Sequence, residues 1–151
     1  INSATLGRIH KDFPRVEIFG NYDVVQKFGD FIKPIATAAF TSGGVLFVPG
    51  YGTHDVPVTF YAFEVRGARC LYATDTNTLP DDLGKFDYMF LESNYDEKKL
   101  FPVLYQNHKG WNPAEGNLRH YSTKQCKLFF YSHRRTRESQ LIELHKSSRF
   151  Y

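Results

Sequence analysis

The chain is poor in the residues that mark several familiar classes of protein. It has two cysteines, one methionine and one tryptophan among 151 residues. Cys70 and Cys126 form neither a CxxC pair nor a zinc-finger spacing. Both lie in apolar segments and are interpreted as buried thiols, which favours a reducing compartment and a cytoplasmic location, although a pairing between them stays open. No apolar run approaches the roughly 18–20 residues that span a bilayer, and no signal peptide is visible.

The chain is rich in apolar and aromatic residues. Hydrophobic residues make up 42% of the sequence and aromatic residues 17%, which excludes an intrinsically disordered chain. The length predicts a single domain over residues 1–151 with a real core. The net charge of +3 is only mildly basic. Many of the positively charged residues are concentrated in residues 124–149. This segment is interpreted either as a solvated face or as a phosphate-binding patch.

Periodicity predicts strands and helices in alternation. Thr59–Val65 and Arg69–Ala73 alternate with period two around a turn at 66–68, which predicts a hairpin. Further strands are expected at Val16–Phe19, Val45–Val48 (ending at Pro49-Gly50), Tyr88–Leu91 and Gln140–Leu144. Helices are expected before Pro14, at Asp23–Phe28 ending at Gly29, from Asp96 to Leu100, and after a capping box at Ser122–Gln125. Residues 107–117 are expected to form a loop. The pattern is typical of a layered α/β domain.

Three polar residues follow predicted strands in a way that suits a metal site. His54 follows the strand over residues 45–48 through a glycine-containing turn, Asp75 follows Ala73 closely, and His145 follows Leu144 directly. Metal ions that activate water are held by neutral imidazoles and carboxylates from rigid elements. Each residue alone is more often a turn or capping residue, but the ordered set of three favours a shared site.

An ordered set of motifs resembles the later part of the metallo-β-lactamase fold. His54-Asp55, Thr74-Asp75-Thr76 and Leu144-His145 resemble its later metal motifs, Phe90-Leu91-Glu92 its glutamate-bearing strand end, and His120-Tyr121-Ser122-Thr123 its His-Ser-Thr element. The branch that these motifs resemble contains RNase Z and related phosphodiesterases. The resemblance implies an αββα sandwich with mixed sheets flanked by helices.

The resemblance also implies roles. His54 would bind one metal ion, Asp75 would bridge two, and His145 would bind the second, with zinc or manganese as the ions. His120 would act as the general acid at the leaving oxygen, a task that suits an imidazole. Glu92 would either orient His120 or be an ordinary strand-end carboxylate. The substrate phosphate would be contacted by Ser148, Arg149 and Ser122.

The first metal motif of that fold, His-x-His-x-Asp-His, is absent from the sequence. We therefore expect the chain to be the later two-thirds of such a fold, with the motif immediately upstream of Ile1. Weak metal binding or none, and little turnover, are expected of the isolated chain. Loss of the first strands would leave a sheet edge open, and we expect a homo-oligomer or a partner to cover it.

The leading functional hypothesis is a metal-dependent phosphodiesterase or nuclease acting on nucleic acid or on linear or cyclic nucleotides. The alternative is a non-catalytic interaction module that kept the fold after losing the first motif. A β-lactam or thioester hydrolase is disfavoured, since acyl hydrolysis does not call for the His120 element. His10, His108 and His133 match no motif and are interpreted as surface residues.

Overall fold

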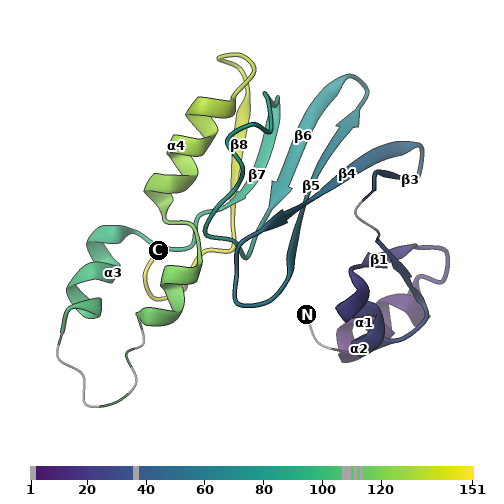
Figure 1. The fold of residues 1–151 in the computed structure, drawn as a ribbon, viewed down its shortest axis with the longest axis horizontal. Coiled ribbons are helices and arrows are strands. Elements are labelled where there is room, and N and C mark those ends of the chain that lie inside the picture. Colours follow the sequence, from purple (N-terminus) through teal and green to yellow (C-terminus); the bar gives the residue numbers. More distant parts are fainter. Residues whose placement is uncertain (1–2, 36–37, 107–109, 111, 113) are drawn as a thin grey trace. The chain divides into compact units, whose positions relative to one another are not determined.

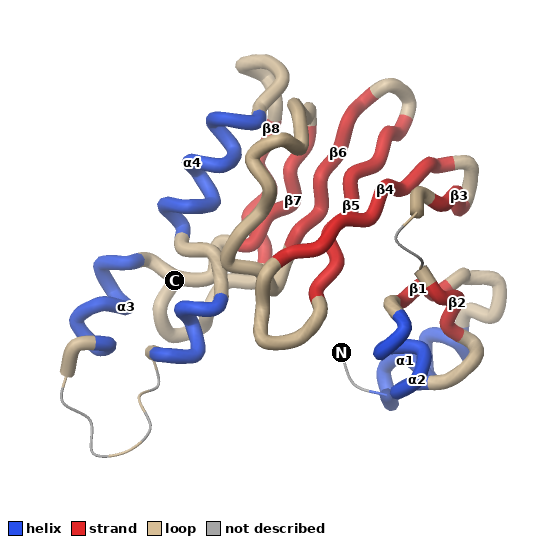
Figure 2. The backbone as a smooth tube through the Cα atoms, viewed as in Figure 1, coloured by secondary structure: helices blue, strands red, loops and turns tan. Residues whose placement is uncertain are grey.

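A computed structural model describes residues 3–35, 38–106, 110, 112 and 114–151. It divides into two compact units, Ile1–Pro49 and Gly50–Tyr151, whose elements are drawn in Figures 1 and 2. A single domain over the whole length stays a prediction. Among the described residues, no helix combines the length and the apolar character that crossing a membrane requires.

The first unit holds a parallel strand pair joined by a short helix. After α1 (Ser3–Asp12), strand β1 (Ile18–Gly20) pairs in parallel with β2 (Ile32–Pro34), and α2 (Tyr22–Phe28) lies between them in the chain. The Asn21 side chain accepts a hydrogen bond from the backbone N–H of Val24 at 3.0 Å, which caps α2. Gly29 ends the helix with a positive φ of 111°. The helix predicted to end at Gly29 is confirmed.

The next hairpin turns on two glycines. Strands β3 (Phe40–Ser42) and β4 (Val45–Gly52) are antiparallel, and Gly43 and Gly44 between them have φ of 57° and 77°, as a tight two-residue turn requires. The prediction that this second strand stops at Pro49-Gly50 was wrong, because β4 continues to Gly52. Gly50 is needed for close packing instead: a Cβ there would lie 2.1 Å from the Phe60 ring.

The second unit is built on a mixed sheet. Strand β5 (Val58–Val65) is antiparallel to β6 (Ala68–Ala73), and the turn at Arg66-Gly67 has φ of 51° and 80°. The predicted hairpin is therefore confirmed. Strand β7 (Tyr88–Glu92) then pairs in parallel with β6, and β8 (Gln140–Leu144) in parallel with β7. The predicted α/β class with a mixed sheet is confirmed for this unit.

Helix α4 (Thr123–His133) packs its apolar side against this sheet (Figure 1). Ser122 and Gln125 form the predicted capping box at its start. The core that helix and sheet share includes Leu71 and Met89 of the strands and Cys126 of the helix. Burial raises the pKa of the Cys126 thiol to about 12. Cys70 and Cys126 are both buried and free, as predicted.

Two predicted boundaries differ from the structure. Helix α3 (Glu97–Leu104) runs through Pro102 rather than stopping at Leu100. Within the segment expected to be a loop, Glu115–Arg119 forms a 3₁₀ helix, η1, whose first residue donates its N–H to the carbonyl of Asn112 at 3.2 Å. Residues 107–109, 111 and 113 of that segment, including His108, lie outside the described residues. His10 is exposed, and its ring stacks on Phe31.

The interpretation of His133 as a surface residue was wrong. His133 is only 5% exposed, and its ring stacks on that of Phe129 with the two ring centroids 3.9 Å apart. The two ring nitrogens lie 3.0 Å from carbonyl oxygens, Nδ1 from that of Phe129 and Nε2 from that of Asp81. This second contact could not be predicted from local sequence pattern, because Asp81 lies 52 residues away. His133 therefore ties the end of α4 to the loop between β6 and β7.

We expect His133→Phe to lower the free energy of unfolding by about 1–3 kcal/mol, because it keeps the ring but removes the contacts of both ring nitrogens with the carbonyls of Phe129 and Asp81. His133→Ala removes the ring as well and should cost more. Urea unfolding followed by circular dichroism measures both. The control Arg137→Ala changes an exposed residue and should have little effect. A His133→Phe variant as stable as the native chain would contradict the hydrogen-bonding role.

Candidate metal centre

Polar side chains gather at one edge of the second unit's sheet. Because β6, β7 and β8 are parallel, their carboxyl ends meet at the same edge, which is where open α/β sheets bind ligands. Asp75 lies two residues beyond β6, Glu92 is the last residue of β7, and His145 directly follows β8. His120 joins them from the segment just before α4.

These four residues, Asp75, Glu92, His120 and His145, could hold a metal ion, since one ligand atom from each lies within 4.8 Å of all the others. The Asp75 Oδ1 atom is 3.4 Å from Nδ1 of His145 and 3.9 Å from Nδ1 of His120. Two ligands of a tetrahedral ion with bonds near 2.1 Å lie about 3.4 Å apart. The spacing of Asp75 and His145 therefore matches a shared ion.

Glu92 lies at the centre of the cluster. Its side chain is 1% exposed, and its Oε1 atom is 2.7 Å from Nδ1 of His145 and 2.6 Å from Nδ1 of His120. Its other oxygen accepts the backbone N–H of Thr76 at 2.9 Å. A buried carboxylate needs such partners, because removal from water disfavours its charge. Glu92 thereby connects the ends of three parallel strands.

Thr76 holds the surrounding loops in place. Its hydroxyl donates to the carbonyl of Thr78 at 2.7 Å and accepts the N–H of Thr53 at 3.1 Å. Gly52 allows this approach, since a Cβ there would lie 2.5 Å from the Thr76 hydroxyl oxygen. The loop that carries His54 is thus fixed to the loop that carries Asp75.

Asp75 and His145 both have left-handed backbones, with φ of 56° and 52°. Among the described residues other than glycine, only Arg66 in the β5–β6 turn shares this conformation. Such a backbone is unfavourable for residues with a side chain and tends to persist where function requires it. Both residues turn the chain sharply just past a strand, which keeps their side chains at the sheet edge.

His54 lies at the side of this group. Its ring centroid is 5.1 Å from that of His120, which in turn is 5.1 Å from that of His145. The Asp55 carboxylate forms an ion pair with Arg119 and lies next to Nδ1 of His54. Since Arg119 directly precedes His120, Asp55 connects the segments that carry the two imidazoles.

Unsatisfied nitrogens show that the cluster suits a metal ion. Both ring nitrogens of His54 and Nδ1 of His120 are buried and have no hydrogen-bond partner among the described residues, although a carboxylate oxygen lies close to the Nδ1 atom of each ring. The distances are short but the directions do not suit hydrogen bonds. Buried polar atoms without partners are rare and costly, whereas a neutral imidazole nitrogen is the commonest protein ligand of transition metals. The residues therefore fit a bound cation.

The predicted substrate-binding residues lie in two different settings. Ser148 and Arg149 are exposed in the turn that follows His145. Ser122 is fully buried; its hydroxyl donates to Glu97 and accepts the N–H of Gln125. That hydroxyl is thus used to cap α4. The sequence did not single out Thr76 as a hydrogen-bond partner of Glu92, although its place beside Asp75 was a usable signal.

Solved structures share this architecture. The metallo-β-lactamase fold protein YhfI from Bacillus subtilis matches 96% of the chain with a TM-score of 0.66 at 14% identity. The chain has a metallo-β-lactamase fold. A diphosphatase of the PhnP family matches 96% of the chain (TM-score 0.64, 16% identity), and the short form of human tRNase Z, ELAC1, matches 97% (TM-score 0.57, 13% identity). The fold predicted from the motifs is confirmed.

The metallo-β-lactamase-fold chain spans only part of these proteins. It covers 60% of the YhfI chain, 55% of the diphosphatase and 67% of the tRNase Z. No protein-family model and no curated protein matches the sequence. The similarity to these solved proteins is therefore a similarity of structure.

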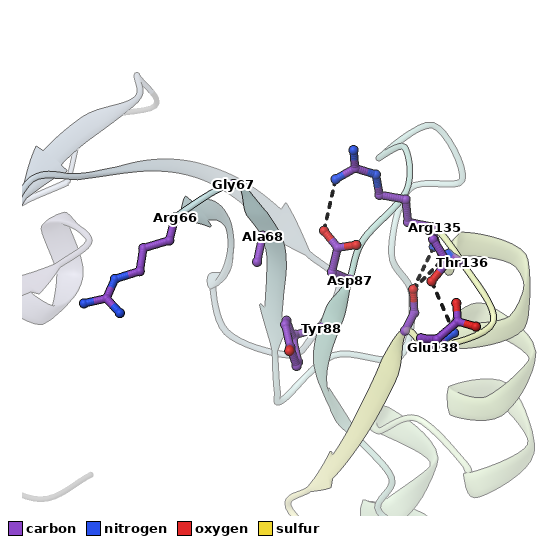
Figure 3. Close-up of a pocket in the computed structure, with 9 residues that line it drawn as sticks. Arg66, Gly67, Ala68, Asp87, Tyr88, Arg135, Thr136 and Glu138 are labelled. Carbon is purple, nitrogen blue, oxygen red and sulfur yellow. Dashed lines mark hydrogen bonds and ion pairs between the residues drawn. The ribbon is translucent and has the colours of Figure 1, made fainter.

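A cavity of about 380 Å³ lies elsewhere in the unit (Figure 3). Ala68, Tyr88 and Ser139 line it, at or next to the amino ends of β6, β7 and β8, so it lies at the edge opposite the cluster. Its charges largely compensate each other, because Asp87 pairs with Arg135 at 3.2 Å. Hydrogen bonding by the backbone N–H of Arg69 is the main cause that keeps the pKa of Asp87 low.

We expect Thr76→Val to weaken metal binding by roughly tenfold, the order seen for residues that orient metal ligands, because it removes the hydroxyl that joins the loops of His54 and Asp75. Isothermal titration with Zn²⁺ measures the effect. Thr41→Val is the matched control, since it removes an exposed threonine hydroxyl on β3, outside the loops that carry His54 and Asp75. Equal affinities of the two variants would contradict the role given to Thr76.

Proposed function

We propose that the chain belongs to a metal-dependent hydrolase that cleaves phosphodiester bonds in nucleic acid or nucleotides. The observation that carries the proposal is the convergence of two carboxylates and two imidazoles, Asp75, Glu92, His120 and His145, at the carboxyl edge of a parallel strand set. A diphosphatase and a tRNase Z are among the solved proteins with this fold, which supports a phosphate ester as substrate.

Asp75 and His145 are the residues proposed to hold the metal, with His54 beside them. In a complete enzyme with two ions, zinc or manganese, Asp75 would bridge while His54 and His145 bind one ion each. The ions supply a Lewis acid for the phosphate and a lowered pKa for attacking water. The sequence holds no His-x-His-x-Asp-His run, so the remaining ligands of a two-ion site would have to come from outside this chain.

His120 is proposed to give a proton to the leaving oxygen. A general acid has to be held in position by a neighbour that does not itself react with the substrate. Glu92 suits that task through its charge rather than through a hydrogen bond, since it is buried, is anchored by Thr76, and has its Oε1 atom 2.6 Å from Nδ1 of His120. Glu92 is therefore a positioning residue for both His120 and His145.

The exposed residues that follow His145 are proposed to meet the substrate. Ser148 and Arg149 both lie within four residues of it, and a guanidinium binds phosphate with two parallel hydrogen bonds. A cytoplasmic location and an oligomeric state remain predictions from the sequence.

We expect the chain to bind Zn²⁺ or Mn²⁺ weakly, and Asp75→Asn and His145→Ala each to lower the affinity at least tenfold, because each removes a ligand. Elemental analysis after dialysis and isothermal titration measure this. His10→Ala removes an imidazole outside the cluster and should bind like the native chain. Asparagine tolerates the left-handed backbone of position 75, so Asp75→Asn tests the charge alone. Metal binding that neither variant changes would favour the non-catalytic interaction module.

We expect His120→Ala to slow hydrolysis of a phosphodiester with an alkyl leaving group by roughly 100-fold or more, the usual contribution of a general acid. Hydrolysis of bis(p-nitrophenyl) phosphate should change far less, because nitrophenolate leaves without a proton. Steady-state rates in Mn²⁺ for the two substrates give the comparison. An equal loss on both substrates would assign His120 to metal binding rather than to proton donation.

A further inference from the structure

A groove of about 440 Å³ lies between the start of α3 and the outer side of α4. Its walls come from the start of α3 and from one face of α4. The lining residues are Asp96, Glu97, Lys98, Thr123, Lys124, Lys127, Leu128 and Tyr131. No role in the metal centre uses them. The hydrogen bond from the Ser122 hydroxyl to Glu97 holds the two helix starts together at 2.8 Å, so the groove has a fixed width at that end.

The α4 side of the groove presents apolar surface to solvent. Leu128 and Tyr131 are each 60% exposed, whereas Cys126, Phe129 and Phe130 on the opposite side of the helix are buried. Positions 124, 127, 128 and 131 follow the spacing of a single helix face. Large apolar side chains exposed next to one another on such a face mark an interaction site more often than scattered ones do.

The charge of the groove favours an anionic partner. Lys98, Lys124 and Lys127 form no ion pair with a carboxylate anywhere in the described part of the chain, and Arg134 lies over the Tyr131 ring at 5.1 Å. The two acidic residues serve as caps and links instead. Asp96 accepts the N–H of Lys98 at 2.9 Å, and Glu97 accepts the Ser122 hydroxyl.

One end of the groove lies near the cluster. Helix α4 starts three residues after His120, and the Ser93 hydroxyl, next to Glu92, donates to that of Thr123 at 3.1 Å. At 1.5 Å per residue, Tyr131 lies about 12 Å further along the helix than Thr123. A strand of several linked nucleotides can reach from the cluster to Tyr131, whereas a cyclic mononucleotide cannot.

We propose that this groove binds a single-stranded segment of nucleic acid, with a base stacked on Tyr131 and phosphates contacted by Lys124 and Lys127. Single strands are bound by this combination of aromatic platforms and cations, because every base has a stacking face and every linkage a negative charge. The inference rests on the proposed function and narrows it, since it assigns the cluster an oligonucleotide substrate.

Binding of a fluorescein-labelled 12-nucleotide oligouridine to the 151-residue chain, followed by anisotropy in EDTA, tests the groove. We expect Tyr131→Ala to weaken binding by roughly tenfold, the range found when stacking platforms are truncated, and Tyr131→Phe to bind like the native chain. Lys124→Glu with Lys127→Glu should weaken binding at least tenfold. The salt dependence, the slope of log K against log salt, should become shallower by about 1.4, the value for two lost phosphate contacts.

Arg8→Glu with Lys11→Glu is the matched control, because it reverses two exposed charges on α1 in the other unit. It should change affinity far less than the groove variants. Native-like affinity of both Tyr131→Ala and the Lys124/Lys127 variant would overturn the proposal. So would a concentration-dependent dimer, seen by analytical ultracentrifugation, that these variants abolish while oligouridine binding is unchanged.

Anisotropy in EDTA requires neither metal nor turnover, so its outcome is separate from that of the metal-binding test. If the chain binds oligouridine through the groove but neither Asp75→Asn nor His145→Ala changes metal binding, the groove stands and the hydrolase proposal falls. If the variants of the metal ligands weaken metal binding but the groove variants bind oligouridine like the native chain, only the groove proposal falls. The substituted residues are exposed, and circular dichroism of each variant checks that it folds as the native chain does.

Discussion

The buried carboxylate of Glu92 is the constraint on which the candidate metal centre depends. A charge removed from water must be compensated at close range. Glu92 forms hydrogen bonds with the Thr76 N–H and with the His145 imidazole, and the His120 imidazole lies beside them. Each partner comes from a different segment of the chain. The same residue that ends β7 therefore fixes how the loops after β6 and β8 and the segment before α4 meet.

Fold and site are connected through the order of the strands. Only parallel neighbours bring several carboxyl ends to one edge, and β6, β7 and β8 supply three of them in succession. His120 joins the cluster from the segment before α4, because the capping box at Ser122 starts the helix just after it. The groove proposed to bind nucleic acid begins at the same helix start, so the cluster and the groove share one support.

Local signals in the sequence predicted much of this. The period-two runs gave the β5–β6 hairpin, the capping box gave the start of α4, and residues after strands pointed to Asp75 and His145. Two things could not be predicted from local pattern. The buried setting of His133 depends on the Asp81 carbonyl 52 residues away, and the central position of Glu92 depends on pairings that become visible only once the strands are aligned. Side-chain contacts over such separations leave no periodic trace.

The parallel alignment of β7 with its neighbours also makes the arrangement of the cluster sensitive to a shift of one residue. Successive side chains of a strand point to opposite faces. A slip of β7 by a single residue against β6 would turn Glu92 away from the imidazoles and bring its neighbour Leu91 to their side. Burial of apolar side chains alone would allow a strand as hydrophobic as β7 to pair in more than one register. The Glu92 carboxylate requires its partners and therefore favours one register. The polar edge thus favours a single pairing of β7, and a misaligned sheet would lose the convergence of the four side chains.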